Sequence, residues 1–545
     1  MIAHGAAPCD EGVLRAGDSA TSSCPERARR WVLAASIIGS SMAFLDGSVV
    51  SVALPALQSE LGVSMRGVQW VVNAYLLMLG ALILVGGLAG DRFGRRRVFV
   101  VGVVVFTLAS VACALAPGVE ALVAARAAQG IGGALLVPTS LALVSAAYPK
   151  DERGRAIGTW AGFSALTTAL GPVLGGWLVD AFSWRAIFFV NVPVAVVALA
   201  AAFLRVPEFR GAAERAPLDW RGALLATSGL GALCWGLTDA AERGWTNSAV
   251  LAALATGVLL LVAFVWSQRA ARAPMMPLDL FASRNFAGAN VMTLLLYCAL
   301  GGAMFFLPFN LIRLQGYSAT TTGAAFLPLT LVMGSLSRWS GGLVERYGAR
   351  TPLIVGPVIA AVGFALLAAP GIAASYWTTF FPAMVVLGLG MAISVAPLTT
   401  VVMSSVDDRH AGTASGINNA VARIAGMLAV ALLGALAVGV FGASLQARLD
   451  ALRIAPDVRA AIMAQAPALA EARVPEELQG FARHAVQFAY DAAFLHGFRV
   501  VMLVACGLAL ASSLCAAWTQ QVPVFRRPAT ARSRVRVPHG RSPRR

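Results

Sequence analysis

Fourteen long apolar stretches are the feature that most limits how this chain can fold. Each has about 20 residues with few charges, the length that an α-helix needs to cross a hydrocarbon layer of roughly 30 Å. Because 58% of the 545 residues are hydrophobic and only 12% are charged, no soluble core could bury them all. We therefore expect an all-α polytopic membrane protein. The stretches lie near residues 31–55, 68–90, 98–117, 119–148, 156–180, 184–204, 222–238, 248–266, 286–308, 322–344, 351–369, 378–403, 413–441 and 494–518.

The positions of the arginines predict the orientation, because basic loops stay in the cytoplasm. With the amino end inside, the inner loops collect most arginines, whereas the short outer loops offer little beyond Arg66, Arg243 and Arg313. Both termini are then cytoplasmic and the number of spans is even. Fourteen spans satisfy this condition, and twelve do so if the seventh and eighth stretches, whose ends are crowded by charges, do not cross. We expect a multi-pass protein of the bacterial inner membrane.

A charged loop occurs twice in the chain, 254 positions apart. Asp91-Arg92-Phe93-Gly94 recurs as Glu345-Arg346-Tyr347-Gly348, each time directly after an apolar run, and Gly87 and Arg96 are repeated at the same offset. Such a repeat indicates two related halves. The halves divide around residues 205–285, which predicts two six-helix bundles joined by two linking helices.

This division predicts five segments. They are a cytoplasmic amino-terminal segment (1–30), a first bundle (31–205), a two-helix linker (206–285), a second bundle (286–518) and a basic cytoplasmic tail (519–545). Within the second bundle, residues 443–492 form a long periplasmic stretch with charges at helical spacing. We expect a solvated helical hairpin there, and docking of a periplasmic adaptor is the alternative.

The net charge of +16 does not call for a nucleic-acid partner, because inner loops and the tail carry much of it and face anionic lipid headgroups. The seven cysteines show no CxxC spacing, and we expect neither a metal site nor a disulfide. No P-loop, HExxH or nucleophile elbow is present in the sequence. The sequence therefore does not predict an enzyme or a cofactor, and energy should come from an ion gradient.

Asp46 is the one carboxylate well inside an apolar stretch. An unpaired charge at that depth costs on the order of a few kcal/mol, so the carboxyl must be neutral part of the time or paired. Burial disfavours a charged carboxyl, whereas a nearby cation favours it, and movement between such environments makes the group bind and release a proton. A proton-coupled pump requires that property. The alternative is a carboxyl that only bonds neighbouring serine or backbone groups.

Arg126 is the expected partner of Asp46. At about 1.5 Å per residue, Asp46 lies roughly 13 Å from the outer end of the first span, and Arg126 lies roughly 10 Å from the outer end of the fourth. The two charges are therefore at similar depth, and we expect them to touch or to share one water. Gln129 is three positions after Arg126 and shares its helix face, so it can hold either charge.

The repeated loop has a mechanical interpretation. Asp91 can accept backbone hydrogen bonds at the start of the third span, and the arginines offer partners for the ends of other helices. Charge pairs there would latch the cytoplasmic ends and release when the bundles rock. Membrane topology alone explains some arginines but not the glycines or Asp91. We assign this gating role to Gly87, Asp91, Arg92, Gly94, Arg95, Glu345, Arg346 and Gly348.

Five motifs, in this order, resemble the major facilitator superfamily. They are FLDGSVVSVALP, GLAGDRFGRRR, RAAQGIGGALLVP, GPVLGGWL and SWRAIFFVNVP, and GTASGINNAVARIAG near residue 418 echoes the second half of that family. More narrowly, the chain is similar to fourteen-span drug:proton antiporters of the EmrB/QacA type. The resemblance extends over nearly all of the apolar sequence.

The resemblance implies roles for particular residues. The family's proton-coupling positions correspond to Asp46 and Arg126. Its antiporter motif falls on Gly171, Pro172, Gly175 and Gly176, where it is thought to seal a leak path between the bundles. From the residues alone, this group can equally be a packing kink, because proline removes a backbone hydrogen bond and glycines permit close helix contact.

We expect a proton-coupled secondary exporter of hydrophobic or cationic organic compounds that works by alternating access. Candidate residues for its substrate cavity are Trp160, Phe163, Tyr297, Phe305 and Arg423, although the aromatic ones can equally face lipid. Two alternatives remain open. One is a dedicated exporter of an endogenous secondary metabolite, and the other is a non-transporting membrane sensor that kept the fold.

Overall fold

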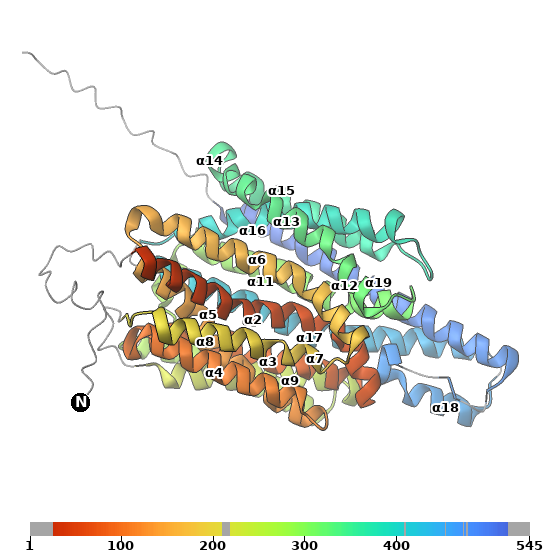
Figure 1. Ribbon diagram of the computed structural model, residues 1–545. Coiled ribbons are helices and arrows are strands. Elements are labelled where there is room, and N and C mark those ends of the chain that lie inside the picture. Colours follow the sequence, from red (N-terminus) through yellow and green to blue (C-terminus); the bar gives the residue numbers. More distant parts are fainter. Residues whose placement is uncertain are drawn as a thin grey trace, which may run out of the picture.

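The computed structural model describes residues 26–209, 218–407, 410–452, 454–471, 474–475 and 478–520. Most of the expected amino-terminal segment and nearly all of the basic tail lie outside these ranges. Within them the regular structure is helical, and the long helices run roughly along one common direction (Figure 1). This arrangement satisfies the backbone hydrogen bonds of each pass internally, as a hydrocarbon environment requires.

The first half contains six passes. They are α2 (Glu26–Leu61), α3 (Met65–Phe93), α4 (Arg95–Ala114), α5 (Val119–Ala147), α6 (Lys150–Ala181), and the consecutive pair α7 (Ala186–Phe189) and α8 (Asn191–Arg205). Glycines let these helices approach closely. A Cβ on Gly132 of α5 would lie 2.5 Å from the backbone nitrogen of Phe106 in α4, and a Cβ on Gly86 of α3 would lie 2.8 Å from the carbonyl carbon of Ala134.

The remaining helices form the linker and the second half. The linker comprises α9 (Trp220–Arg243), α10 (Ser248–Ala270) and the short η1 (Leu278–Ala282). The second half comprises α11 (Arg284–Arg313), α12 (Ala319–Ala325), α13 (Leu327–Gly341), α14 (Leu343–Tyr347), α15 (Arg350–Ala368), η2 (Tyr376–Phe380), α16 (Phe381–Ser404), α17 (Ala411–Asp450), α18 (Pro456–Ala464), η4 (Ala466–Glu471) and α19 (Gly480–Thr519).

Thirteen helices in the described part of the chain are long and apolar enough to cross a membrane. The helix α9 is not among them, because its glycines, Thr227, Ser228 and charged ends lower its hydropathy. It is nevertheless about 36 Å long and lies antiparallel to α10, with Gly229 against Leu261 and Gly236 against Leu254. With α9 included, fourteen passes agree with the expected even number.

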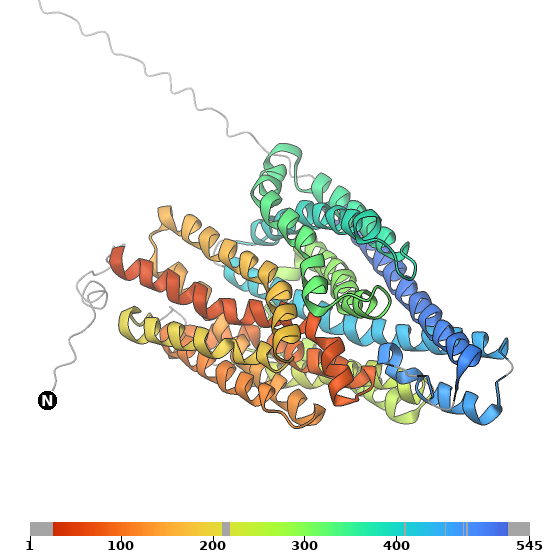
Figure 2. The ribbon, with the colours of Figure 1, turned by 45° about the vertical axis from the view of Figure 1, so that its right-hand side comes forward.

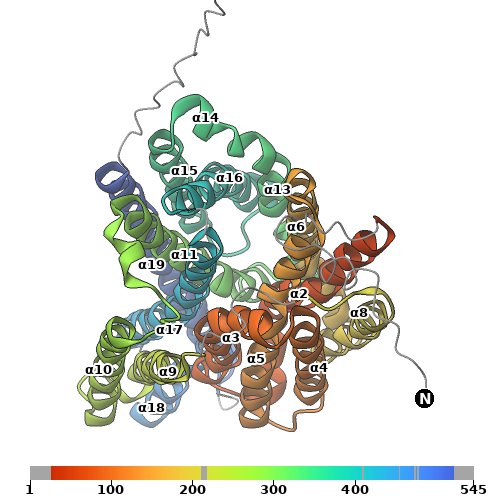
Figure 3. The ribbon, with the colours of Figure 1, turned by 90° about the vertical axis from the view of Figure 1, so that its left-hand side faces the viewer.

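The linker helices lie at one side of the junction between the two halves. Viewed end-on, α9 and α10 sit beside the place where α17 of the second half meets α3 of the first (Figure 3). The apolar core at this junction combines Leu77 and Ala81 of α3, Leu230 and Cys234 of α9, and Met427 and Ala431 of α17. The helix α9 therefore contacts both halves at once.

The described parts of the stretch 443–492 are mostly helical, as expected, but more buried than a solvated hairpin. It continues α17 and α19, each of 40 residues and about 60 Å long, and with α18 it projects beyond the other helices (Figures 1 and 2). Ile462, Leu469 and Tyr490 are buried in the same apolar core as the adjoining helices. Apolar side chains on one face of these helices, which the scattered charges masked in the sequence, account for this difference.

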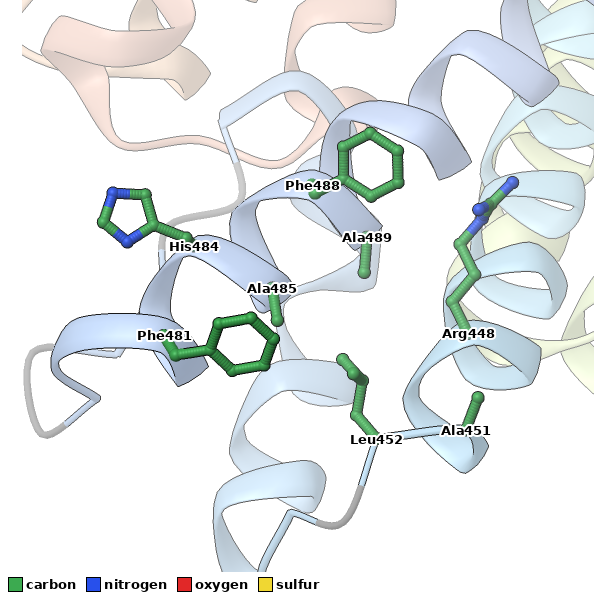
Figure 4. Close-up of a pocket in the computed structure, with 8 residues that line it drawn as sticks. All are labelled: Arg448, Ala451, Leu452, Phe481, His484, Ala485, Phe488 and Ala489. Carbon is green, nitrogen blue, oxygen red and sulfur yellow. The ribbon is translucent and has the colours of Figure 1, made fainter.

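One face of this projection remains open to solvent. A groove lies between the end of α17 and the start of α19, with Leu452 on one side and Phe481 and Phe488 on the other (Figure 4). Phe481 is 88% exposed and Phe488 is 63% exposed. Arg448 and His484 lie at the margin of the groove.

Candidate functional site

The helices α2 and α5 place two buried opposite charges in direct contact. A nitrogen of Arg126, Nη1, donates to Asp46 Oδ2 at 2.5 Å. Asp46 is 1% exposed and Arg126 is 2% exposed, so water does not screen this pair. The similar depths counted along the two helices thus correspond to a real ion pair within the first bundle.

Gln129 completes the pair as its position on α5 predicts. Its Nε2 donates to Asp46 Oδ1 at 2.8 Å, while its Oε1 accepts from Arg126 Nη1 at 2.6 Å. The same Nε2 also donates to Ser110 Oγ of α4 at 2.7 Å, and Asn191 of α8 donates to that hydroxyl at 3.1 Å. The buried carboxylate is therefore held by a network that spans four helices.

Arg126 has further partners that sequence reasoning did not identify. Its Nε donates to the Val71 carbonyl of α3 at 3.0 Å, and its guanidinium carbon lies 4.3 Å from the centre of the Tyr75 ring. Such a cation–π contact favours the charge in a dry environment. If Asp46 became neutral, Arg126 would lose its only paired carboxylate in the described structure. Buried charges without a counter-charge are costly, so protonation of Asp46 favours rearrangement around Arg126.

The glycines of α6 allow two helices to approach this helix from different sides. On one side, a Cβ on Gly171 would lie 2.9 Å from Ser48 Cβ, and a Cβ on Gly175 would lie 2.9 Å from the Val49 carbonyl oxygen of α2. On the other side, Gly176 faces α12, where a Cβ would lie 2.5 Å from the Ala319 carbonyl carbon. The predicted motif therefore forms a close contact between the halves through Gly176. Through Gly171 and Gly175 it also contacts α2 only two to three residues from Asp46.

Pro172 and Gly323 make the reciprocal contact. A Cβ on Gly323 of α12 would lie 2.5 Å from the carbonyl carbon of Pro172. Pro172 lies inside α6 and does not end it. Backbone therefore meets backbone at this interface, and a side chain on either helix would separate the two halves.

Asp180 strengthens the same interface and was not singled out from the sequence. Its Oδ2 accepts from the Thr320 backbone nitrogen at 2.8 Å and from Thr320 Oγ1 at 2.6 Å, while Oδ1 accepts from the Ala319 nitrogen at 3.2 Å. A carboxylate of the first half thus satisfies the free backbone donors at the start of α12 in the second half. The only sequence signal for Asp180 is its place at the end of the fifth apolar stretch, eight residues after Pro172.

Both repeated loops turn at a glycine with a positive φ angle. Gly94 follows α3 with φ +105°, and Gly348 follows α14 with φ +74°. Residues with a Cβ rarely adopt these angles, which explains why both copies carry glycine. Upstream, a Cβ on Gly87 would meet Pro138 of α5 at 3.7 Å, an ordinary contact. Arg346 lies in α14, whereas the side chain of Glu345 is outside the described part of the structure.

The expected role of Asp91 at the start of α4 is wrong, because Glu208 has that role. Glu208 Oε1 accepts from the Arg96 nitrogen at 2.9 Å, and Oε2 accepts from the Arg97 nitrogen at 3.2 Å. Asp91 belongs to the last turn of α3 and instead accepts from Arg95 Nε at 2.9 Å. The guanidinium of Arg95 also donates to the Ala142 carbonyl at 3.0 Å. Arg92 lies over the Phe93 ring at 5.4 Å.

The candidate cavity residues separate into three environments. Phe305 is 3% exposed and packs against Phe306 and Phe309, which makes it a core residue rather than an accessible surface. Phe163 on α6 is 50% exposed. Trp160 lies edge-on to Phe44 of α2, at 5.9 Å between ring centres, and Tyr297 and Arg423 are partly buried.

A second buried carboxylate lies outside this site. Asp239 of α9 is fully buried and pairs with Arg66 of α3 and with Arg243, each at 2.5 Å. Glu242 adds a longer pair with Arg66 at 3.6 Å and accepts from Ser64 at 2.7 Å. Asp46 is thus not alone as a buried carboxylate, because packing of α9 against α3 removes the end of the seventh pass from solvent.

Comparison with known proteins gives the family of the chain. The family model described as Major Facilitator Superfamily matches residues 36–430. "Multidrug resistance protein Stp" of Mycobacterium tuberculosis (strain CDC 1551 / Oshkosh) is 36% identical over 438 residues, which are 79% of this chain and 80% of the relative. The "Tetracenomycin C resistance and export protein" of Streptomyces glaucescens is 37% identical over 419 residues, 75% and 76% of the two chains.

A third relative and a solved structure agree with this result. "Puromycin resistance protein pur8" of Streptomyces alboniger is 37% identical over 434 residues, 78% of this chain and 86% of the relative. The structure of a bacterial homolog of the human lysosomal transporter Spinster, inward-facing and unoccupied, covers 92% of this chain and 100% of its own, with a TM-score of 0.63 and 17% identity. The last comparison concerns the fold alone.

Proposed function

This chain belongs to the major facilitator superfamily, and from that premise we propose that it is a proton-coupled exporter of drugs or antibiotics. It acts as a secondary carrier in the bacterial inner membrane, with both termini in the cytoplasm. The names of three relatives, which refer to multidrug, tetracenomycin C and puromycin resistance, support the substrate class. The two halves provide the bodies that rock in alternating access.

The buried pair of Asp46 and Arg126 is the observation that supports proton coupling best. Asp46 is 1% exposed and Arg126 is 2% exposed. The Asp46 carboxyl is therefore either charged and held by Arg126 and Gln129, or neutral and released from them. Proton binding therefore changes the contacts between α2 and α5. Since α2 also lies against α6, which contacts the second half, a change at Asp46 can reach the interface between the halves.

The coupling cycle follows from these contacts. With Asp46 charged, the carboxylate holds Arg126 and the first bundle keeps its present packing. A proton from the outer side neutralises Asp46, and its release to the cytoplasm restores the ion pair. The proton gradient drives export when the empty carrier can return to the inward-facing state only with this proton bound to Asp46. The repeated loops and the α6–α12 interface act as the gates at the two ends of the path.

Everted membrane vesicles provide the test of this function. The vesicles are energised with NADH, and uptake is followed for a panel of cationic, neutral and anionic lipophilic dyes. We expect uptake that stops when nigericin collapses the pH gradient and that is lost in Asp46→Asn at equal membrane abundance. Uptake that continues without the pH gradient would contradict proton coupling, and no uptake of any compound would contradict an exporter of broad range.

A dedicated exporter of one endogenous metabolite is the second candidate. The relative described as a tetracenomycin C resistance and export protein supports it. The same vesicles distinguish the two candidates. A dedicated exporter takes up a compound from extracts of the producing cell but none of the foreign dyes.

A further inference from the structure

Arg423 lies in the middle of α17, where the second half meets the first. It is twelve residues after Ala411 at the start of the helix, about 18 Å along the axis. A Cβ on Gly80 of α3 would lie 3.2 Å from Arg423 Cβ, so the stem of this side chain starts at the junction of the two halves. In the end-on view, α17 adjoins both α3 and α11 (Figure 3).

A polar side chain lies beside Arg423 on α17. Asn419 is one turn earlier on the same helix face, and its side chain is exposed although it lies deep in the sequence of α17. Its Nδ2 donates to the Ser415 carbonyl at 3.0 Å. One turn after Arg423, a Cβ on Gly426 would lie 3.6 Å from Leu76 of α3, and a Cβ on Gly301 of α11 would lie 3.1 Å from Gly426.

The charges at the junction do not balance. Asp46 is paired with Arg126, and Asp239 is paired with Arg66 and Arg243. Among the described residues, no carboxylate forms an ion pair with Arg423. Arg423 therefore adds a positive charge that no ion pair with a described carboxylate offsets, which leaves an excess of one positive charge at the junction. The excess grows to two when Asp46 takes up a proton.

An excess positive charge determines which compound can be enclosed. A guanidinium deep in a membrane protein costs on the order of a few kcal/mol once water is excluded, unless an anion accompanies it. A carboxylate or phenolate supplies that counter-charge, and a guanidinium binds such groups through paired hydrogen bonds. A cationic compound would add repulsion instead. The ring of Tyr297 in α11, which is only partly buried, can pack against an aromatic body.

We infer that Arg423 holds the anionic group of the exported compound, and that the substrate is an aromatic acid such as an ionised phenol or carboxylic acid. This inference rests on the proposed export function and specifies its substrate class. It replaces the expectation, drawn from the sequence, that the substrates are hydrophobic or cationic. Arg423 is thereby a specificity-determining residue of the second half, whereas Asp46 and Arg126 serve the proton in the first.

Binding of two dyes to the purified full-length protein tests the inference. Fluorescein is anionic and rhodamine 123 is cationic, and both have the same type of xanthene body. Fluorescence anisotropy should give at least about tenfold tighter binding of fluorescein to the unchanged chain. Arg423→Gln should lose about tenfold or more of the fluorescein affinity, while Arg423→Lys keeps most of it. Arg269→Gln, an exposed arginine at the end of α10, serves as the matched control and should bind like the unchanged chain.

Each other outcome overturns the assignment. Binding of rhodamine 123 as tight as that of fluorescein, binding of neither dye, or full fluorescein affinity in Arg423→Gln would each do so. Vesicle transport is measured separately, so the two proposals fail separately. A chain that exports rhodamine 123 but does not bind fluorescein refutes the anion site and keeps the exporter. A chain that binds fluorescein through Arg423 but moves no compound with the pH gradient refutes the exporter.

Discussion

Gly176 of α6 lies against the carbonyl group of Ala319 at the start of α12, so that an added Cβ would lie 2.5 Å from the carbonyl carbon. The two residues belong to different halves of the chain. Because the contact is between backbones, its strength depends on the absence of a side chain rather than on a particular chemical group. A single methyl group added at Gly176 should therefore disturb the contact that closes the end of α6 against the start of α12.

Gly176→Ala should weaken the contact between α6 and α12. The added methyl cannot fit without moving one helix, and overpacking of this kind costs about 1–3 kcal/mol. We expect faster labelling by a membrane-impermeant maleimide at Thr322→Cys, since Thr322 is fully buried behind this contact. Gly158→Ala is the matched control on the same helix, because nothing lies within 4 Å of its added Cβ. Equal labelling in both backgrounds would show that the contact does not hold this end closed.

Asp180→Ala should open the same end for a different reason. The substitution removes the acceptor for the backbone nitrogens of Ala319 and Thr320, and loss of such a cap costs about 0.5–2 kcal/mol. Asp180→Asn retains an acceptor oxygen and should behave almost like the unchanged chain. Maleimide labelling at Thr322→Cys again gives the measurement. The role of this contact is refuted if Asp180→Ala labels no faster than Asp180→Asn.

Asp239→Ala should destabilise the protein more than Glu26→Ala. Asp239 is fully buried and its loss leaves Arg66 and Arg243 without this carboxylate, but the two arginine side chains are 32% and 48% exposed, so solvent screening limits the cost to about 1–3 kcal/mol. Glu26 pairs with Arg30 at the surface, where both side chains are at least 70% exposed and the loss is about 0–1 kcal/mol. Thermal unfolding in detergent gives the comparison. Equal shifts in the unfolding midpoint would mean that Asp239 does not anchor the linker to α3.

Depth along a helix could be counted from the sequence, and contacts that depend on depth were predicted well. Asp46, Arg126 and Gln129 lie on long uninterrupted spans, so their meeting followed from residue number and helix rise. The repeat also singled out Gly94 and Gly348 as a matched pair, and both have a positive φ angle. In each case the signal was local or periodic.

Contacts that depend on how span ends fold back could not be predicted. Glu208 and Asp180 lie at or beyond the ends of helices, where a shift of one residue changes the partner, and Asp239 is buried only because α9 packs on α3. Phe305 could not be assigned to core or cavity, because an aromatic residue in an apolar span has the same sequence signature in both. The contacts of these residues can be assigned only when the tertiary arrangement of the helices is known.

Transport by Asp46→Asn in proteoliposomes tests the central claim most directly. The variant keeps the shape of the side chain but cannot bind and release a proton, so it should still exchange labelled for unlabelled substrate across the membrane. It should not accumulate substrate when a pH gradient is imposed, whereas the unchanged chain should do both. Accumulation by Asp46→Asn at the rate of the unchanged chain would contradict the assignment of Asp46 as the proton-coupling residue.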